Sequence, residues 1–184
     1  MKTVNVPPFF HEVWGKRTTK LELGITIIFS VTMTVVLFAF TYSEWRELEL
    51  WKIVILASLA LDITGGVIAN LTFGTNHYYK HRPTARYIFL FIHVQPVIFA
   101  LILWNYFAAC IAVWGYTILS ALFVNRFINH PAQRVIAAVF LTSGIGGLFL
   151  LFYPIPKFLF ILLLFYVVKV IYSFAVDHYA EREG

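Results

Sequence analysis

The sequence predicts an all-α membrane protein, a bundle of six transmembrane helices built as one domain. Of the 184 residues, 60% are hydrophobic and 12% are charged, and the mean hydropathy is +0.80. Soluble domains usually carry about 25% charged residues. Several apolar runs approach the roughly 20 residues that a helix needs to cross a bilayer. The expected layout is an N-terminal segment at 1–20, the transmembrane domain at 21–176 and a polar cytoplasmic tail at 177–184.

The N-terminal segment is expected to lie in the membrane interface on the cytoplasmic side. Phe9 and Trp14 stand close to Lys16 in the sequence. Apolar side chains beside basic ones are typical of a chain that lies on a lipid surface. Thr19, followed three residues later by Glu22, is a capping-box pattern, which predicts that the first long helix begins here.

Six apolar runs are expected to form the transmembrane helices, with polar turns and prolines between them. Pro83 excludes a continuous helix after the second run, and Pro131 suits the first turn of the fifth helix. Pro96 predicts a kink in the third helix and leaves the carbonyl of Ile92 as a spare hydrogen-bond acceptor. The expected spans are 21–42, 52–73, 87–104, 107–123, 135–152 and 158–174.

Basic residues predict the orientation, because cytoplasmic loops of membrane proteins are enriched in Lys and Arg. With both termini inside, each inside segment is richer in Lys and Arg than its outside neighbours. We therefore expect an N-in, C-in protein of the plasma membrane. The inside segments then contain Lys2, Lys16, Arg17, Lys20, Lys80, Arg82, Arg86, Arg126, Arg134 and Arg182, and the outside segments contain Arg46, Lys52 and Lys157.

Asp62 stands in the middle of the second span, where a carboxylate is costly and indicates a functional site. Asp62, Gly66 and Asn70 follow one another at intervals of four, so they share one face of the helix. At 1.5 Å per residue, Asp62 lies roughly 16 Å from the cytoplasmic end, near the midplane. Other polar residues enter the cytoplasmic halves of the third and sixth spans. The predicted site for a solute or protons contains Asp62, Asn70, His93, Gln95 and Lys169.

These polar residues also have structural explanations. Asp62 and Lys169 could neutralise each other as an ion pair that only holds helices together, and the sequence leaves this choice open. His93 and Gln95 could equally form hydrogen bonds between helices. Glycines in the second and fifth spans are expected to be positions of close helix packing. They are Gly65, Gly66, Gly144, Gly146 and Gly147.

Three functions are compatible with these residues. The first is a small transporter or channel-like protein, in which Asp62 compensates the charge of the solute or carries a proton, and His93 is able to titrate near neutral pH. The second is a membrane-embedded enzyme acting on a lipid headgroup, with Asp62 and His93 as acid and base. In that case Lys80, Arg82 and Arg86 would hold the phosphate. The third is a structural or assembly protein, for which a dry, fully paired Asp62 is expected. Whether the chain is an enzyme is left open.

No cofactor and no metal site are predicted. His77 and His81 stand four residues apart and could share a helix face as metal ligands. Membrane di-iron enzymes, however, use several such histidine pairs. The single cysteine, Cys110, excludes an internal disulfide. The expected partners are the bilayer and anionic lipid headgroups at its cytoplasmic face. A homo-oligomer is left open, and no nucleic acid is expected.

Overall fold

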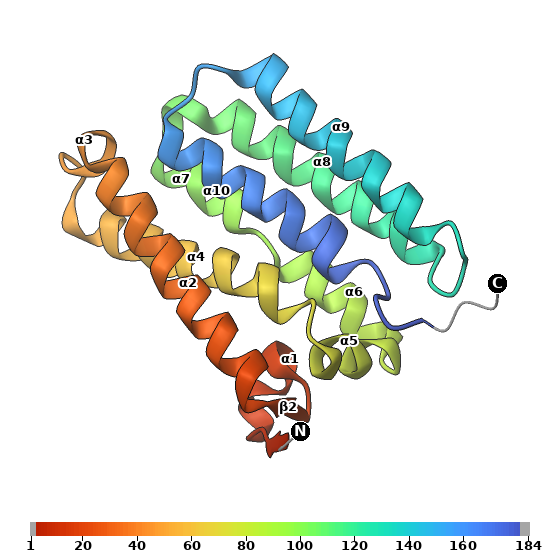
Figure 1. The fold of residues 1–184 in the computed structure, drawn as a ribbon. Helices are drawn as coiled ribbons and strands as arrows, with labels where there is room; N and C mark the ends of the chain where they lie inside the picture. The colour runs from red at the N-terminus through yellow and green to blue at the C-terminus, as the bar shows by residue number, and fades with distance from the viewer. Residues whose placement is uncertain (1–2, 181–184) are drawn as a thin grey trace.

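The computed structural model describes residues 3–180 and is mostly helical (78%). Six helical segments are long and apolar enough to cross a membrane, which indicates an integral membrane protein and confirms the helical class. Within residues 3–180, a two-stranded sheet is the one departure from it. The two termini lie toward the same end of the bundle (Figure 1). The N-in, C-in orientation stays a prediction, and Lys2 and Arg182, which contribute to it, lie outside the described residues.

The six long segments run alternately up and down through the bundle (Figure 1). They are α2 (Lys20–Phe40), α4 (Leu50–Ala69), α6 with α7 (Pro83–Ile92 and Gln95–Ile102), η2 with α8 (Trp104–Tyr106 and Phe107–Arg126), α9 (Gln133–Phe152), and α10 with η3 (Lys157–Val167 and Val168–Phe174). The second span ends earlier than predicted, because Thr72 caps a separate helix, α5 (Phe73–Lys80). The third begins earlier than predicted, because Pro83 occupies its first turn. A short helix, α3 (Tyr42–Trp45), lies between α2 and α4.

The sixth span forms the centre of the bundle. Figure 1 shows α10 between the α2–α4 pair and the α8–α9 pair, and α10 contacts α4, α8 and α9. In the sixth span 61% of the most apolar stretch is buried, against 17% in the first and in the fifth. Lys169 in η3 therefore stands on the most enclosed of the six spans, where a lone charge would be very costly.

The first span packs on the second through small and hydroxyl-bearing residues. Thr26, Ser30 and Thr34 form a buried face of α2. Ser30 Oγ donates to the carbonyl of Leu61 at 2.8 Å, and a Cβ added at Gly65 would lie 3.1 Å from Ser30 Oγ. Inside a bilayer, small residues allow helices to approach closely, and hydroxyl groups can bridge them. The expected close packing at Gly65 is confirmed.

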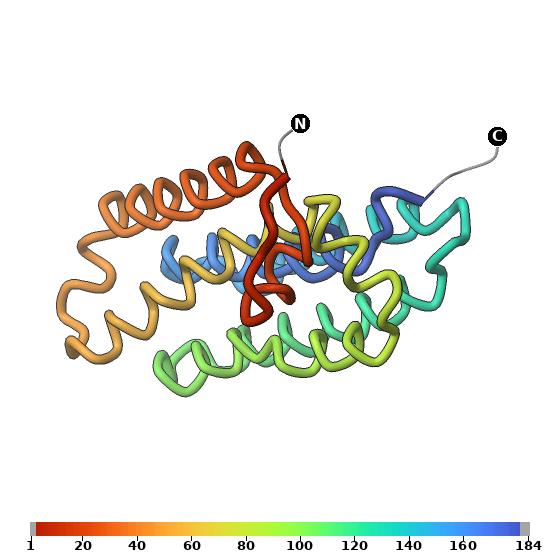
Figure 2. The backbone as a smooth tube through the Cα atoms, turned by 90° about the horizontal axis from the view of Figure 1, so that it is seen from below, coloured from red at the N-terminus to blue at the C-terminus, as the bar shows by residue number. Residues whose placement is uncertain are grey.

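The N-terminal segment folds back beneath the bundle as a small hairpin. Its elements are β1 (Thr3–Asn5), η1 (Pro8–Phe10), α1 (His11–Trp14) and β2 (Arg17–Thr19), and the two strands pair antiparallel. Figure 2 shows the segment lying across the end of the bundle, and α1 contacts α4 and α5. The capping box is confirmed: Thr19 Oγ1 accepts from Glu22 N at 3.1 Å, and Glu22 Oε2 accepts from Thr19 N at 2.9 Å.

Gly15 and Gly74 hold this segment against α5. Gly15 has a φ of 68°, in the left-handed region that favours glycine. A Cβ added at Gly15 would overlap the carbonyl group of Gly74, and one added at Gly74 would lie 2.6 Å from the carbonyl oxygen of Trp14. Thr75 Oγ1 also donates to the carbonyl of Val13 at 2.6 Å. The two backbones therefore meet where a side chain does not fit.

Gly15→Ala is expected to detach the N-terminal segment from α5 while the long helices stay folded. A β-carbon adds strain of about 1–3 kcal/mol at such a backbone position, in addition to the overlap. Because Lys16 and Arg17 follow directly, trypsin should cleave there at least about tenfold faster. The control is Gly24→Ala in α2, where an added Cβ meets nothing within 4 Å. Equal digestion of both variants would contradict this role of Gly15.

Candidate functional site

Asp62 and Lys169 form an ion pair inside the bundle. Lys169 Nζ lies 2.8 Å from Asp62 Oδ2, and Gln95 Nε2 donates to the same oxygen at 2.7 Å. The Lys169 side chain is 2% exposed, whereas the Asp62 side chain is 51% exposed. Asp62 and Lys169 therefore do pair, which the sequence alone left open. The pair is not fully enclosed, however, because half of the Asp62 side chain stays accessible.

Gly66 provides the opening through which Lys169 reaches Asp62. A Cβ added at Gly66 would lie 2.8 Å from Lys169 Cδ and 2.9 Å from Lys169 Nζ. The expected close packing at Gly66 is confirmed, and the group that fills the gap is the lysine side chain. Lys169 stands at the start of η3, a π-helical continuation of α10. Such π-helical turns inside longer helices are frequent at functional sites.

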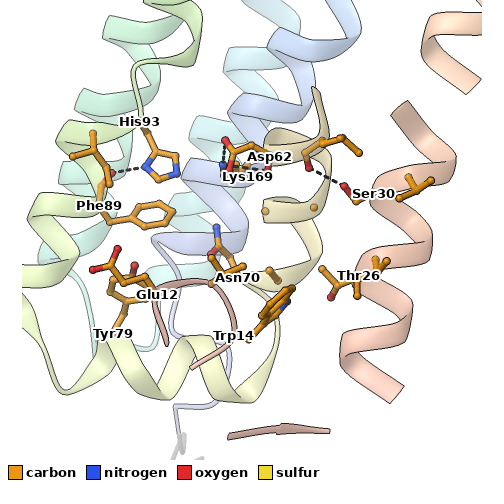
Figure 3. A pocket seen from close by; sticks show the side chains of 18 residues that line it. Glu12, Trp14, Thr26, Ser30, Asp62, Asn70, Tyr79, Phe89, His93 and Lys169 are labelled. Atoms are coloured by element: carbon orange, nitrogen blue, oxygen red, sulfur yellow. Dashed lines mark hydrogen bonds and ion pairs between the residues drawn. The ribbon is translucent and has the colours of Figure 1, made fainter. Parts of the chain in front are cut away.

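The third span breaks at His93 and Val94, close to the kink that Pro96 predicts. There α6 ends at Ile92 and α7 begins two residues after His93. The prediction that the carbonyl of Ile92 is a free hydrogen-bond acceptor is wrong, because it accepts from Val94 N at 2.9 Å. The break turns the backbone locally and so leaves His93 at the end of α6, facing the ion pair (Figure 3).

The neutral His93 ring is held in one tautomer. Its Nδ1 contacts the carbonyl oxygen of Phe89, and since a carbonyl only accepts, Nδ1 carries the hydrogen. Nε2 then has a free lone pair, and it makes no hydrogen bond within residues 3–180. The ring stacks on Phe89 with centroids 3.7 Å apart. The Tyr166 hydroxyl donates to the His93 carbonyl at 2.7 Å. His93 is therefore a fixed proton acceptor.

A cavity of about 370 Å³ opens beside these residues. Its walls come from α2, α4, α5, α6 and η3, and α1 lines its end near the N-terminus. In Figure 3, Asp62, Lys169 and His93 lie at one end, with Asn70 between them and the residues of α1. The lining includes the polar side chains of Glu12, Trp14, Asp62, Asn70, His93 and Lys169.

The cavity offers both unused donors and unused acceptors. Trp14 Nε1 and Asn70 Nδ2 are buried and have no hydrogen-bond partner among the described residues. Buried polar groups of proteins are nearly always satisfied, so these two donors suit a polar molecule in the cavity. At the other end, Asp62 Oδ1 and His93 Nε2 make no hydrogen bond with any part of the chain that the structure describes, and both can accept.

Most of the site predicted from the sequence is brought together here. Asp62, Asn70, His93 and Lys169 line the cavity, and Gln95 lies behind it, bonded to Asp62. The sequence did not reveal Glu12, Trp14 and Tyr79, which also line it. Burial, and to a lesser degree the Glu12 carboxylate, raise the pKa of the Tyr79 hydroxyl above its ordinary value. No local pattern indicates that the N-terminal segment reaches this cavity.

The basic residues predicted to hold a lipid phosphate do not converge on one site. Arg86 is buried, and its Nε donates to Asn125 Oδ1 at 2.7 Å, which ties α6 to α8. Lys80 Nζ lies 2.9 Å from Asp177 Oδ2. Of the three, Arg82 alone lines a large cavity, which is separate from the one beside Asp62. Headgroup binding by these residues stays a prediction.

His77 and His81 lie next to each other at the end of α5. Their ring centroids are 4.4 Å apart, and His81 Nδ1 lies 3.0 Å from the carbonyl oxygen of His77. Within residues 3–180, no group of three or more His, Cys, Asp or Glu side chains is placed to hold a metal ion. Two histidines alone leave at least half of a metal coordination shell to other ligands.

Comparisons with known proteins do not assign this cavity to a family. No protein-family model, no curated protein and no solved structure matches the chain.

Proposed function

We propose that the protein is a small transporter or channel-like protein of the plasma membrane, which binds a polar or ionic solute, or protons, beside Asp62. One observation carries the proposal: Lys169 and Gln95 hold the Asp62 carboxylate through one oxygen, and half of its side chain stays accessible. Charged residues inside membrane spans are costly and mark pathways for ions, protons and substrates. The cavity volume of about 370 Å³ is near the lower end for ligand sites, at roughly 300–1,000 Å³.

The arrangement supports exchange at the ion pair. A cationic solute could compete with Lys169 for Asp62, and an anionic one could compete with Asp62 for Lys169. Alternatively, a proton that neutralises Asp62 would weaken its attraction to Lys169, and His93 Nε2 is a base with a free lone pair in the same cavity. Because Glu12, Val13 and Trp14 of α1 line the cavity, the N-terminal segment borders the path of a solute that enters from the predicted cytoplasmic side.

Asp62→Asn tests the proposal, because the amide keeps the size of the side chain and removes its charge. Proteoliposomes loaded with a pH-sensitive dye report proton flux, and ion-selective dyes report K⁺, Na⁺ and Cl⁻. We expect the flux of the transported species to fall at least about tenfold, since hydrogen bonds to charged groups contribute roughly 1.5–3 kcal/mol. The control is Ser58→Ala on the same helix, where Ser58 Oγ bonds only to its own helix. A folded Asp62→Asn variant with wild-type flux would refute the proposal.

A second candidate is a membrane-embedded enzyme acting on a lipid headgroup. Two observations favour it: His93 Nε2 is a fixed base beside Asp62, and the cavity wall includes the exposed apolar side chains of Ile27, Val31 and Ile92. Such an apolar edge would admit an acyl chain from the bilayer. Lipid breakdown by the wild-type protein, without ion flux, would select this candidate. A purely structural role has less support, because the Asp62 side chain is half-exposed.

A further inference from the structure

A second, larger cavity lies beside the N-terminal hairpin. It has a volume of about 970 Å³ and shares no lining residue with the cavity at Asp62. The N-terminal hairpin forms one side of it, with β1, Lys16 and β2, followed by the first turn of α2. The other side comes from α5, from His81 and Arg82 directly after it, and from Tyr179 in the C-terminal segment. It therefore joins parts of the chain that are far apart in sequence, from Thr3 to Tyr179.

The charged side chains that line this cavity are mostly positive. Lys16, Arg17 and Arg82 line it, and no carboxylate of residues 3–180 forms an ion pair with any of them. The acidic residue in its described lining is Glu22, and that carboxylate is already engaged. It accepts from Thr19 N at 2.9 Å and from the Thr19 hydroxyl at 2.8 Å. The cavity thus holds three cationic side chains against one carboxylate, so positive charge is in excess.

The cationic groups are held in a way that suits a phosphate. The Arg82 guanidinium lies 4.0 Å from the centroid of the Tyr78 ring. Stacking of this kind fixes the guanidinium plane and leaves its N–H edge free for a bidentate contact. His77 and His81 add two exposed imidazole rings to the same wall. Imidazole N–H groups can donate hydrogen bonds to an oxyanion.

We infer that this cavity binds the phosphate group of an anionic phosphate ester, with Lys16, Arg17 and Arg82 as its main contacts. Phe73 and Tyr179 stand exposed at its edge, and aromatic side chains of this kind are typical of the membrane interface. The headgroup of an anionic phospholipid and a soluble phosphate ester share the required chemistry. The site does not depend on the function proposed for the Asp62 cavity.

The site also controls the hairpin, because one short segment borders both cavities. Glu12 and Trp14 line the cavity at Asp62, while Lys16 and Arg17, directly after them, line the basic cavity. A phosphate that bridges β2 and Arg82 holds the hairpin against the end of α5. Binding in the basic cavity should therefore protect the N-terminal segment from proteolysis, an effect that loosely attracted ions on the surface would not produce.

The test compares two double variants of the full-length protein in detergent. Lys16→Gln with Arg82→Gln removes two cations from the cavity, and Lys20→Gln with Arg126→Gln removes two exposed cations outside it. Native mass spectrometry measures binding of phosphatidylglycerol, with phosphatidylcholine as the neutral comparison. We expect the first double variant to bind phosphatidylglycerol at least about tenfold more weakly than the wild type, and the second to stay within about twofold.

Glycerol phosphate distinguishes the two sources of the phosphate. If it competes with phosphatidylglycerol at similar concentrations, a soluble ester is the ligand; if it does not compete, the lipid is. Both results support the site, provided that the ligand also slows cleavage of the N-terminal segment by chymotrypsin in the wild type and not in the first double variant. Equal lipid binding by both double variants, or unchanged cleavage in the presence of either ligand, would overturn the inference.

Discussion

Asp62→Ala is expected to destabilise the protein by about 3–5 kcal/mol, because it leaves the Lys169 ammonium buried without a counter-charge. Lys169 is 2% exposed, and Asp62 is its ion-pair partner within residues 3–180. Gln95 would lose its acceptor as well. Thermal unfolding can be followed with a thiol-reactive dye, since Cys110 is free and fully buried in the folded protein. The dye should react at a markedly lower temperature in the variant.

The double variant Asp62→Ala with Lys169→Met separates the loss of the pair from the loss of one charge. Methionine is about as long as the apolar part of lysine and carries no charge, so most of the stability should return. Ion flux should not return, because the charged group at the cavity is still missing. If Asp62→Ala alone unfolds at the wild-type temperature, the ion pair does not stabilise the bundle, and Lys169 reaches water in the folded state.

The long helices were predictable because membrane spans follow directly from apolar runs of sufficient length. Their ends were less predictable, since local hydrogen bonds decide them. Thr72 could be seen to lie near the inner end of the second span, but its role as the cap of α5 depends on the turn before it. At Pro96 the expected kink was found, whereas the freed carbonyl of Ile92 was taken by a backbone turn at Val94.

The candidate site was predictable only in part. The stripe of Asp62, Gly66 and Asn70 follows from helical spacing, which is a local property. The contact between Asp62 and Lys169 joins residues 107 positions apart, and charge alone could suggest it but not decide it. The sequence did not predict that α1 lines one end of the cavity, because this depends on the close approach of Gly15 to Gly74. Neither glycine belongs to a pattern that indicates its partner.

The glycines of the spans illustrate the same limit. A Cβ added at Gly144 would lie 2.7 Å from Tyr116 Cε1, so close packing is confirmed there. At Gly146 and Gly147 an added Cβ would meet nothing within 4 Å, so the expectation of close packing is wrong for both. A glycine in a membrane helix permits a close neighbour, but only the arrangement of the whole bundle determines whether a neighbour comes close.

Gly66→Ala is expected to break the Asp62–Lys169 pair without changing either residue. The added methyl group would lie 2.9 Å from Lys169 Nζ and 2.8 Å from Lys169 Cδ, so the side chain has to withdraw from the carboxylate. Overpacking of this kind costs about 1–3 kcal/mol, and the displaced ammonium stays buried. The unfolding temperature should therefore fall, as in Asp62→Ala, and ion flux should fall as well.

The matched control is Gly147→Ala, which makes the same chemical change in another transmembrane helix. An alanine there meets no atom within 4 Å and improves the helix by up to about 1 kcal/mol, so the stability should stay unchanged or rise. Gly66→Ala should thus lower the stability of the protein, whereas Gly147→Ala should not. Both variants gain the helix propensity of alanine over glycine, but only the methyl group at position 66 collides with Lys169. A Gly66→Ala variant as stable and as active as Gly147→Ala would mean that Lys169 reaches Asp62 by another path.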